Sequence, residues 1–64
     1  MNKSYCYVND IGEPKELVVE FPPKNGEYSV ILWSRRTGDL CGSGKMTYQR
    51  LKEYLEHYGV QIDF

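Results

Sequence analysis

This chain lacks a surplus of charge of either sign. Its 64 residues hold 8 Lys and Arg against 9 Asp and Glu, which gives a net charge of −1. Proteins that bind duplex nucleic acid usually carry a basic surplus that displaces counterions, and a nucleic-acid mimic needs a strong acidic surplus. The overall electrostatics therefore favour neither class.

Long apolar runs are also missing. No stretch approaches the roughly 20 apolar residues of a membrane-spanning helix, and the polar start Met1–Ser4 does not resemble a secretory signal. We expect no membrane association and a cytoplasmic location. In that reducing compartment Cys6 and Cys41, the only cysteines, are expected to be free thiols.

No catalytic or phosphate-binding motif is complete. The segment Gly42–Lys45 has the composition of a phosphate loop, which needs four residues between its glycines and a hydroxyl residue after the lysine. Here five residues separate Gly38 from Gly44, and Met46 follows the lysine. We interpret the segment as a flexible connector between a strand and a helix.

Metal-binding spacing is absent as well. Cys6, Cys41 and His57 are too dispersed for a closed zinc site, and we expect two buried thiols and a surface histidine. A chain this short hardly forms a closed pocket alone. We therefore predict no cofactor, no metal, no small-molecule substrate and no enzymatic activity.

The clearest local signal is a capped amphipathic helix near the C-terminus. Thr47 is a good N-cap, Met46 and Leu51 have the spacing of a hydrophobic staple, and Gly59 suits a left-handed C-terminal cap. These signals predict a helix that begins at or next to Thr47 and ends by Gly59. Its apolar stripe consists of Tyr48, Leu51, Leu55 and Tyr58, with Tyr54 at the margin.

Most of the remaining chain alternates as β-strands do. Asn25 and Gly26 form a typical two-residue hairpin turn. The sequence predicts a single domain over residues 1–64 of α+β class: a four-stranded antiparallel meander, one amphipathic helix packed on one face, and a C-terminal edge strand, in the order ββββαβ. The predicted strands are Ser4–Val8, Leu17–Phe21, Tyr28–Arg35, Asp39–Gly42 and Val60–Phe64.

The register of the fourth strand depends on the turn around Gly38. A two-residue turn pairs Arg35 with Leu40 and places Leu40 on the face of Trp33. A three-residue loop with a left-handed Gly38 pairs Arg35 with Asp39 and moves Leu40 to the opposite face. We favour the second register, because it buries a leucine and uses the glycine.

The third strand is apolar on both faces, and one helix stripe can cover only one of them. We predict a core face made of Leu17, Val19, Phe21, Val30, Leu32 and Leu40. The opposite face then carries Val18, Ile31, Trp33 and Cys41, joined from the first strand by either Tyr5 and Tyr7 or Cys6 and Val8. A contiguous apolar patch of this kind indicates an interface, although antiparallel sheets often leave one face wet and the Asn9–Lys15 loop could cover it.

These patterns favour a small non-enzymatic protein-interaction module: an adaptor, regulator or inhibitor of the type common among bacterial and phage accessory proteins. Two alternatives are an obligate homodimer and single-stranded nucleic-acid binding through the same aromatic and arginine face. Near-neutral charge disfavours nucleic acid. The predicted partner-binding residues are Trp33, Ile31, Val18, Arg35, Tyr5 and Tyr7.

Overall fold

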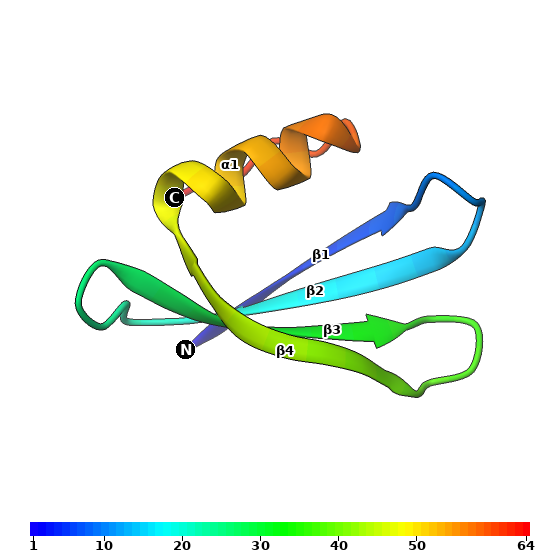
Figure 1. The fold of residues 1–64 in the computed structure, drawn as a ribbon, viewed down its shortest axis with the longest axis horizontal. Coiled ribbons are helices and arrows are strands. Elements are labelled where there is room, and N and C mark those ends of the chain that lie inside the picture. The colour runs from blue at the N-terminus through cyan, green and yellow to red at the C-terminus, as the bar shows by residue number, and fades with distance from the viewer.

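The computed structural model describes all of residues 1–64 and shows one sheet followed by one helix (Figure 1). The strands are antiparallel and pair in chain order, so the predicted α+β class and four-stranded meander are confirmed. The elements are β1 (Asn2–Val8), β2 (Pro14–Glu20), β3 (Glu27–Ser34), β4 (Leu40–Thr47) and α1 (Tyr48–His57).

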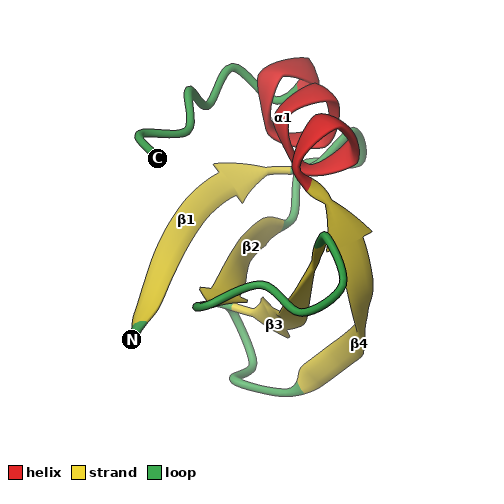
Figure 2. Cartoon of the chain, turned by 90° about the vertical axis from the view of Figure 1, so that its left-hand side faces the viewer, coloured by secondary structure: helices red, strands yellow, loops and turns green.

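The sheet curls strongly, and α1 lies across its open side near the ends of β1 and β4 (Figure 2). The apolar stripe of the helix packs against three strands to build the core, as the four-residue spacing of Leu51 and Leu55 predicts for one face of a helix. Leu51 and Leu55 are completely buried. The buried core residues are Tyr7, Leu17, Val19, Val30, Leu51 and Leu55.

Both predicted helix ends are confirmed. The Thr47 hydroxyl accepts a hydrogen bond from the Arg50 backbone N–H at 3.2 Å, which satisfies one of the unpaired donors of the first turn. At the other end Gly59 has φ 78°, and the Val60 N–H donates to the Leu55 carbonyl at 2.9 Å. A left-handed glycine followed by this bond is the usual way to stop a helix.

The predicted fifth strand is wrong. Residues 60–64 belong to no strand, and none of their backbone groups bonds to the sheet. Instead the tail runs back along α1 towards the start of the helix (Figure 1). Val60, Ile62 and Phe64 still pack against the core. Their alternation reflects one buried side, which an extended unpaired tail provides as well as a strand does.

The tail is anchored by side chains. Phe64 packs against four aromatic rings, with centroid distances of 4.8 Å to Phe21, 5.4 Å to Tyr28, 5.8 Å to Tyr48 and 6.3 Å to Tyr5. Next to it, Asp63 accepts hydrogen bonds from the Tyr5 hydroxyl at 2.6 Å and the Lys3 ammonium at 2.9 Å.

The β2–β3 hairpin has the predicted turn but a different register. Asn25 and Gly26 both have positive φ, and Lys24 bridges to Glu27. A regular continuation would pair Phe21 with Val30, yet Val30 pairs with Val19. The intervening prolines cannot donate to a ladder, so this segment loops out. A shift of two residues leaves every side chain on its predicted face.

In the β3–β4 hairpin, the favoured register holds only in part. Leu32 pairs with Gly42 as that register requires, but a bulge follows, and Trp33 pairs with Leu40. The expected burial of Leu40 is therefore wrong: its side chain is 58% exposed on the face of Trp33. Cys41 is the extra residue, and its sulfur lies 3.4 Å from the Lys15 ammonium on the helix side of the sheet. Its predicted place beside Trp33 is also wrong.

The fourth strand is longer than predicted. It continues through Gly42–Lys45 to Thr47, so that segment is paired strand and not a flexible connector. Glycine has a low strand propensity, which hid the element in the sequence.

Candidate interaction surface

The face of the sheet that α1 does not cover carries an apolar patch, which we call the helix-free face. The helix and the C-terminal tail both lie on the other side of the sheet (Figure 2). Strand pairing places on the helix-free face Asn2, Ser4, Cys6, Val8, Glu16, Val18, Glu20, Ser29, Ile31, Trp33, Leu40, Ser43 and Lys45.

Trp33 lies on the inner strand β3, near the end of that strand. It pairs with Glu16 on one side and Leu40 on the other, while Val18 and Ile31 pair with each other in the next row. The predicted grouping of Trp33, Ile31 and Val18 is therefore confirmed. These three are half-buried, whereas Leu40 is largely exposed. Leu40 was missed because the bulge that turns it outward leaves no pattern in the sequence.

The loop between β1 and β2 does not cover the helix-free face. Its Asp10 carboxylate lies 3.5 Å from the ring of His57 on α1, and its Glu13 carboxylate lies 3.1 Å from the Arg36 guanidinium. These contacts hold the loop at the end of the sheet and on the helix side. The Asn9–Lys15 loop therefore does not cover the helix-free face, which was the alternative that the sequence left open.

The placement of Tyr5 and Tyr7 beside Trp33 is wrong. Tyr5 pairs with Leu17 and Tyr7 with Lys15, so both side chains point to the helix side, and Cys6 and Val8 take the helix-free face. Either set of alternate residues in the first strand suits the core face, and a shift of the strand register by one residue exchanges the two sets.

Both tyrosines are tied into the fold. Tyr7 is 7% exposed, stacks on Tyr58 at 4.5 Å and shares a hydrogen bond with the Tyr54 hydroxyl. Burial, reinforced by that bond, raises the pKa of Tyr7 well above its ordinary value. Burial and the hydrogen bond to Asp63 raise the pKa of Tyr5 to about 12. Neither phenol is therefore ionised near neutral pH, and neither is available at the helix-free face.

Arg35 lies at the edge of the Trp33 patch. It is exposed, and its backbone N–H donates to the Pro14 carbonyl at 3.0 Å, which continues the β2–β3 ladder. A shallow depression of about 320 Å³ opens here, lined by Glu16, Trp33, Ser34, Arg35 and Gly38. It is polar apart from the indole, so it suits a polar group of a partner next to an apolar anchor.

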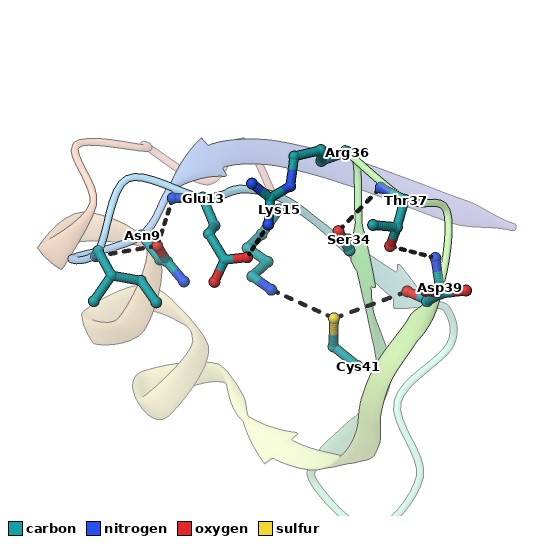
Figure 3. A network of polar contacts seen from close by, with 9 residues as sticks. Asn9, Glu13, Lys15, Ser34, Arg36, Thr37, Asp39 and Cys41 are labelled. Atoms are coloured by element: carbon teal, nitrogen blue, oxygen red, sulfur yellow. Dashed lines mark hydrogen bonds and ion pairs between the residues drawn. The ribbon is translucent and has the colours of Figure 1, made fainter.

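Hydrogen bonds hold the two loops next to this depression in place (Figure 3). The Asn9 side-chain oxygen accepts from the Glu13 N–H at 2.8 Å, and Glu13 in turn pairs with Arg36. In the loop between β3 and β4, the Ser34 hydroxyl accepts a hydrogen bond from the Thr37 backbone N–H at 3.3 Å. Loops that are already ordered lose less entropy when a partner binds.

The chain brings no metal-binding set together: no three His, Cys, Asp or Glu side chains cluster. Cys6 and Cys41 are unpaired and lie on opposite faces of the sheet. Both are exposed, so the expectation of buried thiols is wrong. His57 is exposed in the last helical turn, as predicted. The structure contains no helix with the length and apolarity needed to traverse a bilayer.

No protein-family model, curated protein or solved structure matches the chain.

Proposed function

We propose that this chain is a small non-enzymatic interaction module that binds a protein partner through the helix-free face. One observation carries the proposal: Trp33 stands beside the exposed Leu40 on a sheet face that neither the helix nor the tail covers. Such a module covers part of its partner's surface and thereby serves as an adaptor, a regulator or an inhibitor, including in phage or bacterial accessory systems.

The energetics of the face fit this role. Trp and Arg are enriched among the few residues that dominate binding energy, and such anchors sit within a ring of weaker contacts. Here Trp33 is the anchor, Leu40, Ile31 and Val18 surround it, and Arg35 lies at the rim. A standard interface buries about 800 Å² on each partner. That area is about a fifth of the chain's 4342 Å².

Nucleic acid has less support as the ligand. Stacking of successive bases needs several aromatic rings along a basic groove. With Tyr5 and Tyr7 on the other side, Trp33 is the one aromatic ring among the residues paired across this face. Glu16 and Glu20 offset the positive charges of Arg35 and Lys45, so the face is not a basic groove. We further propose a cytoplasmic location, because a reducing compartment maintains free thiols such as Cys6 and Cys41.

The test is affinity capture from native host lysate with the wild type, Trp33→Ala and Ile11→Ala, each with and without nuclease. Ile11 is a matched control because it is 78% exposed in the β1–β2 loop, outside the face. We expect a nuclease-resistant protein band with the wild type and Ile11→Ala. Trp33→Ala should lose about 2 kcal/mol of binding free energy, so this variant should bind the partner about 30-fold more weakly than the wild type. A nuclease-sensitive band, or equal capture by all three proteins, would contradict the proposal.

A further inference from the structure

A second apolar surface lies on the helix side of the sheet. It is a groove of about 290 Å³ between α1 and strands β3 and β4, and it is separate from the helix-free face. Its lining residues are Leu17, Val30, Leu32, Gly42, Ser43, Gly44, Lys45, Met46 and Tyr54.

Two glycines open this groove, although the fold does not require glycine at either position. Gly42 and Gly44 have no positive φ, and a Cβ atom at either one would meet no other atom within 4 Å. Glycine inside a strand is destabilising relative to alanine, because it loses more backbone entropy on folding. Where neither backbone geometry nor packing demands it, a glycine in a strand often marks the close approach of another backbone or a ligand.

The groove adjoins an unpaired sheet edge. The Arg35 N–H donates to Pro14, and backbone groups in an antiparallel ladder bond to alternate sides. Residues 31, 33 and 35 therefore bond to β2, whereas Val30 and Leu32 bond to Gly44 and Gly42 of β4. The backbone groups of Ser43 and Lys45 consequently point away from the sheet, and β4 is an edge strand with no neighbour to receive them.

We propose that β4 receives an extended segment of a partner protein as an added strand, with large apolar side chains on the helix side and acidic residues at its ends. Side chains of the added strand that lie beside Gly42 and Gly44 would cover the glycines and contact Leu32 and Val30. Aromatic side chains cover strand glycines in this way in other sheets. Main-chain bonds supply affinity in such strand addition, and alternate side chains supply specificity.

Charge and shape distinguish this occupant from a second copy of the chain. No acidic side chain lines the groove. Lys45 lies on the edge strand at one end of the groove, with its side chain on the face of Ile31 and Ser43, and the Lys15 ammonium approaches Cys41 beyond the other end. A partner strand with terminal acidic residues complements these lysines. A second β4 would instead present its own glycines, which cannot fill the groove, and its own Lys45; lysine on an edge strand discourages self-pairing.

The probe is a fluorescein-labelled nine-residue peptide that alternates threonine with phenylalanine between terminal glutamates, followed by fluorescence polarisation. We expect saturable binding to the wild type. In Gly44→Val the valine side chain clashes with no atom of the protein but occupies the groove. This variant should be at least as stable as the wild type, yet bind the peptide at least about tenfold more weakly. Ile11→Ala, in the exposed β1–β2 loop away from the groove, should bind as the wild type does, and so should Trp33→Ala, which separates this site from the helix-free face. N-methylation of alternate backbone amides of the peptide should abolish binding.

Three results would overturn the proposal. The first is no binding of the peptide to the wild type, and the second is equal binding to Gly44→Val. The third is concentration-dependent self-association of the wild type that Gly44→Val removes, because the occupant would then be a second copy. Light scattering on the same samples detects that last case.

Discussion

The substitution Phe64→Ala, which shortens the side chain of the last residue, should destabilise the fold strongly although it removes no backbone hydrogen bond. Phe64 contacts Phe21, Tyr28, Tyr48 and Tyr5, which lie far apart in the sequence. A fully buried phenylalanine costs about 3–5 kcal/mol on truncation, and aromatic pairs add about 0.5–1.5 kcal/mol each beyond their buried area. Because Phe64 is only half-buried at a chain end, we expect a loss of about 2 kcal/mol.

That loss is a large fraction of the total, because a domain of this size draws only about 3–5 kcal/mol from one core. The midpoint of thermal unfolding should fall by about 8–16 °C, at about 4–8 °C per kcal/mol. Urea unfolding followed by far-UV circular dichroism measures the free energy directly. Gln61→Ala is the control, because Gln61 is exposed in the same tail.

A loss for Phe64→Ala below about 0.5 kcal/mol, no larger than that of an ordinary surface substitution, would refute the anchoring role of the tail. Amide hydrogen exchange distinguishes an unpaired tail from a fifth strand. The amides of residues 61–64 should exchange rapidly, because they donate to no backbone carbonyl. Protection as strong as that of β2 would restore the fifth strand that the alternation predicts.

Three further predictions test the caps, the charges and the thiols. Thr47→Ala should lower the free energy of unfolding by about 1 kcal/mol in urea melts, and no change would show that the cap bond to Arg50 is not formed. The hydrogen bond from Tyr5 and the contact with Lys3 lower the pKa of Asp63 below its ordinary value of 3.8, so the stabilisation from Asp63 is complete above pH 3.8 and disappears as the pH falls through the lowered pKa. Thermal melts of the wild type and Asp63→Asn should therefore differ at neutral pH and converge in acid, and a constant difference would contradict this assignment. Cys6 and Cys41 are both exposed, so Ellman's reagent should titrate two thiols without denaturant, and fewer than two would contradict their exposure.

Local chemistry made part of the fold predictable. The cap at Thr47, the stop at Gly59 and the Asn25–Gly26 turn each depend on a few adjacent residues, and all three are observed. The faces of β2 and β3 were also predictable. Buried residues fix side-chain parity there, and a register error of two residues preserves it.

The remainder depended on contacts between distant segments. The bulge at Cys41 exchanged the faces of Leu40 and Cys41, and no local pattern announces a bulge whose extra residue is not glycine. The parity of β1 had to be decided by its partner, because Tyr5 and Cys6 are both acceptable on either face. As a result Val18, Ile31 and Trp33 were placed correctly, with Arg35 at the edge of their patch, and both tyrosines were not.

The assignment of Trp33 to association and not to folding is tested most directly by the free energy of unfolding of Trp33→Ala, measured in urea beside Leu55→Ala. Leu55 is completely buried, and its truncation should cost about 2–5 kcal/mol. Trp33 contributes cross-strand contacts with Glu16 and Leu40 on an open face, each worth about 0.2–1 kcal/mol, so its truncation should cost at most about 2 kcal/mol. A loss of about 3–5 kcal/mol would identify Trp33 as a core residue and contradict its role as the anchor of the interface.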